Sequence, residues 1–320
     1  MPENHMPENP EQETHMTTPA IGVFLPTMSE RGEELPDLVA AARHAEDLGF
    51  ESAWVIDQLV AGTGVPFVDS TVALSAAAAA TTRIRLAYGV LIVPLRPVVW
   101  AAKQAASLQR LSGDRLLLGV GVGGDRHDRS WDAAGVPRRE RGRRLDAALD
   151  VLPDLIAGKE VEVDGAAVQL APGATVPPVV VGGLADAALT RAAVHGDGWF
   201  TLPLPPAQLA PAVARLRELA AQRGREAPAI TASTTVAIDG DRDLPGPGAL
   251  VRRLSDPDGV YGMPAEAVPD ILVTGGPAAV AERLAALAGL GAERVVVTLA
   301  AGDWFRQAEL LAEAGALVQR

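Results

Sequence analysis

Short runs of β-branched and aliphatic residues alternate with longer amphipathic stretches along most of this chain. The runs predict eight strands, at residues 21–25, 52–56, 84–88, 115–120, 179–181, 198–201, 230–238 and 294–299. Apolar positions recur at helical spacing after each run; in the first stretch Leu35, Leu38 and Val39 begin one apolar stripe. The predicted helices cover residues 34–48, 70–81, 97–111, 139–157, 185–195, 206–223, 277–289 and 303–318.

Regular alternation of strand and helix predicts parallel strands joined by crossover helices. Eight such units suit the (β/α)8 TIM barrel, an α/β fold of about 250 residues. An open doubly wound sheet is the alternative, but that fold places a glycine-rich ligand loop after its first strand. Here the first strand runs into FLPTMSERG, which has no such loop. We therefore expect one barrel domain over residues 20–320.

Three segments lie outside the alternation. Residues 160–170 alternate around Asp164-Gly165, which predicts a hairpin. Residues 239–270, between the seventh strand and its helix, are rich in Gly, Pro and Asp and have few apolar anchors. Because barrel active sites form at that face, this insertion is expected to be a mobile lid or binding loop. Residues 1–19 are polar and repeat MPEN, so we interpret them as a disordered tail or a cloning remnant.

Composition narrows the classes of partner. The chain of 320 residues carries a net charge of −12, which argues against nucleic acid and anionic membranes as partners. It has no cysteine, so disulfides, thiolate metal sites and cysteine nucleophiles are excluded. No apolar run approaches the roughly 20 residues of a membrane helix, and no secretory signal is visible. A cytoplasmic protein is the expectation.

Glycines occur at or next to the ends of three predicted strands. GVGVGG at 119–124 matches the dinucleotide pattern G-x-G-x-x-G, but it closes the fourth strand and no helix follows at once. A loop where the backbone comes close to a flat ligand is the better interpretation. Gly89 lies inside a strong strand pattern and indicates a bulge or close approach. Gly182-Gly183 stand between a buried strand and a helix start, which is typical of a tight turn or of an anion site.

Few ionisable residues are expected at the catalytic face. Asp57 and Gln58 follow the second strand, where they would either face the active site or cap a helix. His127, in the loop after the fourth strand, is flanked by Asp125 and Asp128, but no convincing further ligands complete a metal site. The chain also lacks a nucleophile elbow and a P-loop. This scarcity suggests that a planar, phosphorylated cofactor performs the chemistry.

Several blocks resemble the bacterial-luciferase-like flavin- and deazaflavin-dependent oxidoreductases, over about residues 20–300. They are AEDLGFESAWVIDQL, TTRIRLAYGVLIVPLRPVVWAAKQAASLQRLSGDRLLLGVGVGG and PPVVVGGLADAALTRAAVHGDGW. The resemblance implies a (β/α)8 barrel and a homodimer. It further implies a monooxygenase that uses reduced FMN and oxygen on a small organic substrate, with a separate flavin reductase as a partner. Hydride transfer with the deazaflavin coenzyme (factor 420) is the alternative.

The resemblance also assigns residues. The implied cofactor-binding residues are Gly89, Val90, Gly123, Gly124, Gly182, Gly183, Leu184 and Leu202. Gly89-Val90 matches a non-prolyl cis bulge behind the flavin ring, and Gly182-Gly183 matches the phosphate loop. The candidate catalytic residues are His127, Asp57 and Gln58, with His127 expected to transfer a proton.

Two departures favour FMN with oxygen over the deazaflavin. Many deazaflavin enzymes have histidine at the position of Gln58, and some have a glutamate at that of Gly124. Two further hypotheses stay open: a flavin-binding barrel without turnover, and an unrelated barrel enzyme such as an aldolase. A Schiff-base aldolase needs a lysine at a strand end, whereas Lys103 and Lys159 lie in or near helices.

Overall fold

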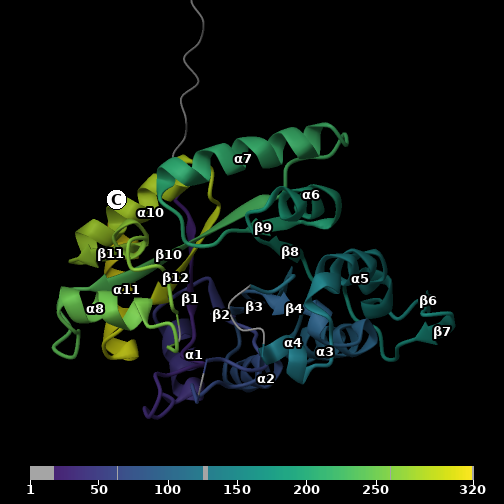
Figure 1. Ribbon diagram of the computed structural model, residues 1–320, viewed down its shortest axis with the longest axis horizontal. Helices are drawn as coiled ribbons and strands as arrows, with labels where there is room; N and C mark the ends of the chain where they lie inside the picture. The colour runs from purple at the N-terminus through teal and green to yellow at the C-terminus, as the bar shows by residue number, and fades with distance from the viewer. Residues whose placement is uncertain (1–17, 63, 125–128, 260, 319–320) are drawn as a thin grey trace, which may run out of the picture.

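Eight parallel strands form a closed barrel in the computed structural model, which describes residues 18–62, 64–124, 129–259 and 261–318 (Figure 1). The strands are β1 (Ala20–Phe24), β2 (Ser52–Val55), β3 (Arg85–Tyr88), β5 (Leu116–Gly121), β8 (Val179–Gly182), β9 (Gly198–Phe200), β10 (Ala229–Ile238) and β12 (Arg294–Leu299). The sheet closes because β1 pairs with both β2 and β12, and β10 pairs with both β9 and β12. The expectation of a (β/α)8 barrel is confirmed. The two-residue strand β4 (Leu91–Ile92) adds to β5.

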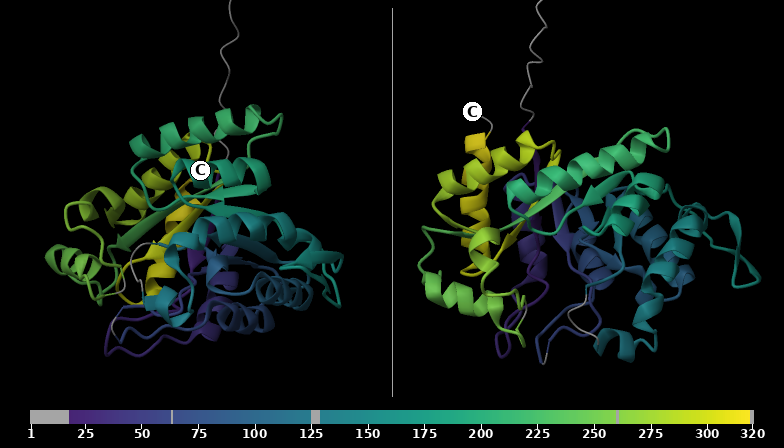
Figure 2. Two further views of the ribbon diagram at one scale, coloured as in Figure 1. Left: turned by 45° about the vertical axis from the view of Figure 1, so that its right-hand side comes forward. Right: turned by 45° about the horizontal axis from the view of Figure 1, so that its top comes forward.

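Helices surround the barrel (Figure 2). They are α1 (Leu38–Asp47), α2 (Ser70–Ala80), α3 (Val98–Ser112), α4 (Arg129–Ala133), α5 (Arg141–Ile156), α6 (Asp186–His195), α7 (Pro206–Ala221), α10 (Pro277–Gly289) and α11 (Trp304–Val318), with 3-10 turns η1 (Val93–Leu95) and η2 (Arg138–Glu140). The first helix begins four residues later than predicted. Asp37 caps it by accepting hydrogen bonds from the N–H groups of Val39 and Ala40, each at 3.0 Å. Within the described part of the chain, no helix is both long and apolar enough to cross a membrane.

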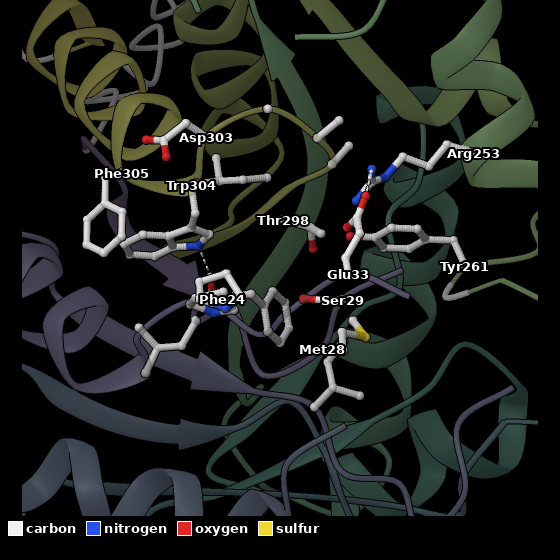
Figure 3. Close-up of a pocket in the computed structure, with 18 of the residues that line it drawn as sticks. Phe24, Met28, Ser29, Glu33, Arg253, Tyr261, Thr298, Asp303, Trp304 and Phe305 are labelled. Carbon is white, nitrogen blue, oxygen red and sulfur yellow. Dashed lines mark hydrogen bonds and ion pairs between the residues drawn. The ribbon is translucent and has the colours of Figure 1, made fainter. Parts of the chain in front are cut away.

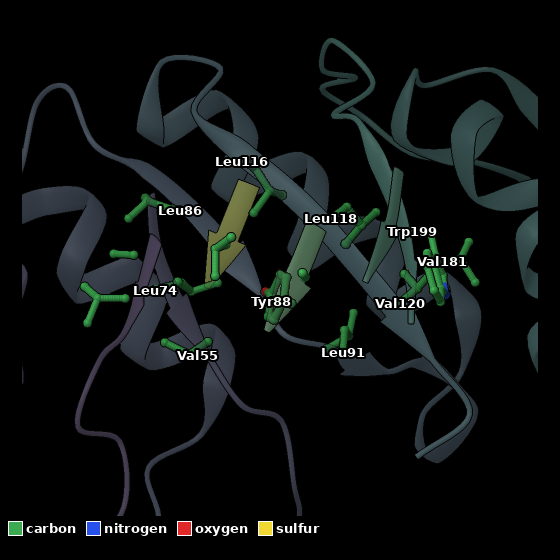
Figure 4. Close-up of a cluster of buried hydrophobic side chains, with 14 of the residues drawn as sticks. Val55, Leu74, Leu86, Tyr88, Leu91, Leu116, Leu118, Val120, Val181 and Trp199 are labelled. Atoms are coloured by element: carbon green, nitrogen blue, oxygen red, sulfur yellow. The ribbon is translucent and has the colours of Figure 1, made fainter. Parts of the chain in front are cut away.

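Period-2 alternation along the strands separates two apolar layers. Inward residues such as Leu117 and Val180 fill the barrel. Outward residues such as Leu116, Leu118 and Val181 pack under the helices, as Figure 4 shows for part of this layer. Both layers are buried, which explains why these strands read as continuous hydrophobic runs.

A β-hairpin of β6 (Glu160–Val163) and β7 (Ala166–Gln169) extends beyond α5 at the edge of the molecule (Figures 1 and 2). Its turn residues Asp164 and Gly165 both have positive φ, 50° and 79°. That backbone suits a tight hairpin turn, so the predicted hairpin is confirmed.

The insertion at 239–270 is more ordered than its composition suggests. It contains α8 (Pro247–Ser255) and most of the short α9 (Val268–Ile271), after which β11 (Leu272–Gly275) pairs with the end of β10. The side chains of Leu250, Leu254 and Val268 are buried. The expectation of few apolar anchors is therefore wrong for the helical part, because Leu250 and Leu254 are four residues apart on one face of α8 and Val268 adds a buried side chain from α9. Movement of this insertion as a lid stays a prediction.

Candidate functional site

A cavity of about 290 Å³ opens at the carboxyl ends of the barrel strands. It gathers side chains and backbone from the loops after β2, β3, β5 and β9, as expected for the active face of such a barrel. Seven of the residues singled out in the sequence line it: Asp57, Gln58, Gly89, Val90, Gly123, Gly124 and Leu202. The structure thus brings together residues up to 145 positions apart in the chain, from 57 to 202.

Three aromatic rings form the floor beneath this cavity. Trp54 and Phe200 stack with centroids 5.1 Å apart and planes 17° apart. Phe24 meets both edge-on at 6.4 Å. A Cβ on Gly89 would lie 2.8 Å from Phe24 Cζ and 3.0 Å from Trp54 Cε3. Only glycine therefore lets the backbone rest on this floor.

The Gly89–Val90 peptide is cis, as the resemblance implied. The Val90 side chain lies between two inward-facing strand positions that carry no side chain. A Cβ on Gly121 would lie 2.6 Å from Val90 Cγ2, and one on Gly182 would lie 2.7 Å from Val90 Cγ1. These glycines make room for the bulge at Val90, rather than for a ligand that touches them directly.

Asp57 is buried and its carboxylate has partners on both oxygens. Oδ1 accepts from Ser70 Oγ at 2.6 Å, while Oδ2 accepts from the Ile92 N–H at 2.8 Å and from Arg96 Nη2 at 2.6 Å. The carboxylate therefore joins the start of α2 to the segment that follows the cis peptide. This geometry favours a positioning role for Asp57 over proton transfer.

The other polar and glycine candidates lie around the rim. Gln58 lines the cavity, and its Nε2 donates to the Val60 carbonyl at 3.1 Å. Gly123 has φ of +74°, and a Cβ there would lie 2.9 Å from Ile92 Cγ2, so this loop also requires glycine. Leu202 is 57% exposed at the cavity and is free to contact a ligand. Among the described residues, no group of three or more His, Asp or Glu side chains could hold a metal ion.

The predicted phosphate loop lies outside the lining of this cavity. Gly182 ends β8, and Gly183 follows with φ of +127°, which disfavours any other residue there. The Gly183 N–H donates to the Phe200 carbonyl at 3.1 Å, so it is not available to an anion. No side chain caps the N-terminus of α6, so the N–H groups of its first turn have no side-chain acceptor.

His127, with its neighbours Asp125 and Asp128, lies outside the described residues. Several residues that line the cavity were missed in the sequence. Ser233 and Thr235 come from the middle of β10, Thr298 from β12, and Tyr261 and Met263 from the insertion. Hydroxyls at alternate positions of a predicted barrel strand could have indicated an inward polar face. Nothing in the pattern of the insertion indicated Tyr261.

Solved structures share this fold. The chain is similar to an F420-dependent secondary alcohol dehydrogenase, solved in complex with an F420-acetone adduct, at a TM-score of 0.78 and 16% identity, over 95% of this chain and 100% of that one. It is similar to monooxygenase RslO1 from Streptomyces bottropensis at a TM-score of 0.73 and 20% identity, over 94% of this chain and 99% of that one. It is also similar to the oxygenating constituent of 3,6-diketocamphane monooxygenase of Pseudomonas putida, solved in complex with FMN. That similarity has a TM-score of 0.71 and 16% identity, over 93% of this chain and 97% of that one.

Sequence comparison gives closer but shorter matches. Uncharacterized proteins of Mycobacterium tuberculosis and Mycobacterium bovis are 37% identical to this chain over 171 residues. Those matches cover 52% of this chain and 58% of each relative, so the chain spans little more than half the length of the curated relatives it matches. The sequence model described as luciferase-like monooxygenase matches residues 15–244. The resemblance found in the sequence is thereby confirmed, and the chain belongs to the luciferase-like monooxygenase family.

Proposed function

We propose that this protein is a flavin-dependent monooxygenase that binds reduced FMN in the cavity over Gly89–Val90 and uses oxygen on a small organic substrate. The observation that carries the proposal is the cavity itself, which is largely apolar and rests on the Gly89–Val90 segment, whose Val90 side chain packs between glycines. Among the three structural neighbours named above, one was solved with FMN and another with an F420-acetone adduct. Hydride transfer with factor 420 is therefore the alternative function.

The cavity suits a flat ring system. Its volume of about 290 Å³ is just below the range of roughly 300–1,000 Å³ for small-ligand sites. The residues missing a side chain at its floor and rim, Gly89 and Gly123, are places where a Cβ would collide with neighbours within 3.0 Å. Polar side chains are a minority of the lining, and among them Gln58, Ser233 and Thr235 could orient the heteroatoms of a ring.

The first turn of α6 suits the phosphate group. A helix N-terminus offers unpaired N–H groups and a partial positive charge. Asp186 lies in this turn, but Arg215 neutralises it with two hydrogen bonds, Nε to Oδ1 at 2.8 Å and Nη2 to Oδ2 at 3.2 Å. We propose that Leu184 and this turn bind the phosphate, while Gly182 and Gly183 shape the approach to it.

Bound FMN would supply the electron transfer that no amino-acid side chain provides. The protein itself would position the cofactor and exclude water from it. Asp57 holds the segment after the cis peptide through the Ile92 N–H and Arg96. The aromatic floor and Leu202 keep the reacting face apolar, which protects reactive species from water.

Three further parts of the proposal rest on the resemblance. His127 is proposed to transfer a proton beside the ring, since its unperturbed pKa lies near neutrality. A separate flavin reductase is proposed to supply reduced FMN. A homodimer is proposed, and exposed apolar side chains on the neighbouring helices α2 and α3 support it: Val72 is 61%, Trp100 64% and Leu111 80% exposed.

The test supplies reduced FMN from NADH and a flavin reductase, together with isotopically labelled oxygen and a panel of small ketones, aldehydes and thioethers. Mass spectrometry should find the label in at least one organic product, and denatured protein should give none. Turnover only with factor 420, and without label, would support the alternative. Binding of either cofactor without any turnover would identify a flavin-binding barrel that is not an enzyme.

A further inference from the structure

A second cavity, of about 220 Å³, adjoins the one over Gly89–Val90 (Figure 3). It lies between β1, β12 and the insertion. Four residues line both cavities: Phe24, Ile56, Tyr261 and Thr298. The two spaces are therefore neighbours across a shared wall, and this wall includes one side chain from the insertion, Tyr261.

Size argues that the two spaces work together. A flat tricyclic ring would use most of the first cavity, since a volume of about 290 Å³ suits one small ligand. A substrate must then approach from the adjoining space. That space offers apolar and aromatic walls from Phe24, Met28 and Trp304 beside polar and charged side chains, so it suits a molecule that has both an apolar part and a polar group (Figure 3).

The Tyr261 hydroxyl is the group at this shared wall that has no hydrogen-bond partner among the described residues. Two side chains with ionisable groups line the first cavity within the described residues, Asp57 and Tyr261. Both oxygens of Asp57 are occupied, as described above. The Tyr261 hydroxyl makes no hydrogen bond to any described residue. Burial raises the pKa of Tyr261 to about 12, which keeps the phenol protonated and able to donate.

The charges around the second cavity disfavour anionic molecules. Three carboxylates line it, from Glu33, Glu34 and Asp303, against a single guanidinium, that of Arg253. That guanidinium is already paired, with Nε 3.2 Å from Glu30 Oε1 and Nη1 3.5 Å from a Glu33 carboxylate oxygen. A carboxylate, sulfonate or phosphate on a substrate would meet repulsion here and no unpaired cation.

We infer that the second cavity is the substrate compartment, that it takes a molecule with an apolar part, an acceptor oxygen and no anionic group, such as a ketone, and that the Tyr261 hydroxyl donates a hydrogen bond to this oxygen. The inference rests on the proposed function, because it places the substrate beside the flavin. Tyr261 thereby selects molecules with an acceptor and holds the oxygen at the boundary between the two cavities.

The experiment measures binding of three probes that share one ring: cyclohexanone, cyclohexanecarboxylate and cyclohexylamine. Tryptophan fluorescence reports binding to the FMN-free protein through Trp304, and a Trp304→Phe variant identifies that signal. The visible absorbance of FMN reports binding to the loaded protein. Tyr261→Phe is the test variant. Tyr88→Phe is its matched control, because it deletes a phenol oxygen that is hydrogen-bonded to Thr71 and lines neither cavity.

Cyclohexanone should bind at least tenfold more tightly than cyclohexanecarboxylate, which the carboxylates repel, and more tightly than protonated cyclohexylamine, which has no acceptor for the Tyr261 hydroxyl. Tyr261→Phe should weaken cyclohexanone at least tenfold, with the Kd for FMN and the unfolding midpoint unchanged, and Tyr88→Phe should leave cyclohexanone binding unchanged. Equal binding of ketone and carboxylate, preference for the amine, or full ketone affinity in folded Tyr261→Phe would each overturn the inference. Failure of the wild-type protein to bind FMN would instead contradict the proposed function, and the fluorescence titration would still decide on the compartment.

Discussion

Replacement of Gly182 by alanine tests the arrangement of glycines around Val90. The new Cβ would lie 2.7 Å from Val90 Cγ1 and 3.3 Å from Val90 Cγ2. Val90 has little room to turn, because its χ1 is stiff and Gly121 packs against Cγ2 from the other side. The substitution should therefore displace the cis segment that forms the floor of the flavin cavity.

The magnitude follows from overpacking. One methyl group forced into a filled interior costs about 1–3 kcal/mol, and the two contacts at Val90 place Gly182→Ala near 2 kcal/mol. Val90→Ala removes both Cγ atoms and with them the collision. The loss of unfolding free energy in the double variant should thus be smaller than the sum of the losses in the two single variants, by about 1 kcal/mol or more. FMN affinity should fall at least tenfold in Gly182→Ala, about 1.4 kcal/mol, and recover partly in the double variant.

Urea unfolding and FMN fluorescence titration measure the two effects. Gly289→Ala is the matched control, because its Cβ would meet nothing within 4 Å at the end of α10. This control should be neutral or stabilising by up to about 1 kcal/mol, since alanine favours a helix. The packing explanation would be refuted if the changes in unfolding free energy of the two single variants simply added up in the double variant. It would also be refuted if Gly182→Ala had normal stability and normal FMN affinity.

Three further predictions concern two ion pairs and the proposed dimer. Burial opposes ionisation of Glu51, but the hydrogen bonds and charge of Arg294 outweigh burial and lower the Glu51 pKa in the folded protein. The pair therefore stabilises the fold at pH values above the Glu51 pKa of the unfolded chain. This stabilisation is lost as the pH falls through the Glu51 pKa of the folded protein. Arg294→Met should cost about 2 kcal/mol at pH 7 in urea unfolding, with the difference narrowing below about pH 4; a constant difference would contradict this. Asp57→Asn should destabilise by about 3 kcal/mol because Arg96 loses its charged partner, and an unchanged urea midpoint would count against the positioning role. Trp100→Glu should yield monomers in sedimentation if α2 and α3 form the proposed dimer interface, and unchanged dimers would place the interface elsewhere.

Much of the fold was predictable because the strands are buried on both faces. Runs such as Val179–Val181 carry this signal directly, and the hairpin was predicted from Asp164-Gly165, a turn that needs positive φ at both residues. The helical part of the insertion was not predictable from composition. Its buried Leu250 and Leu254 form a pattern too short to distinguish from a loop rich in Gly, Pro and Asp.

The candidate site was predictable in its residues more than in their roles. The sequence singles out Gly182 as a cofactor-binding residue, but only the fold reveals that its missing side chain accommodates Val90, a residue 92 positions earlier. Asp57 was expected as a polar neighbour of the chemistry, while its three hydrogen-bond donors come from residues that the sequence does not connect to it. Long-range contacts of this kind carry no local sequence signal.

The central claim is that the cavity over Gly89–Val90 binds reduced FMN. Parallel anaerobic titrations of the protein with reduced FMN and with reduced factor 420 test it most directly. The account predicts saturable binding of FMN with a Kd at least tenfold lower than that of factor 420, and weaker FMN binding by Gly182→Ala than by Gly289→Ala. Tighter binding of factor 420, binding of neither cofactor, or equal FMN binding by the two variants would contradict it.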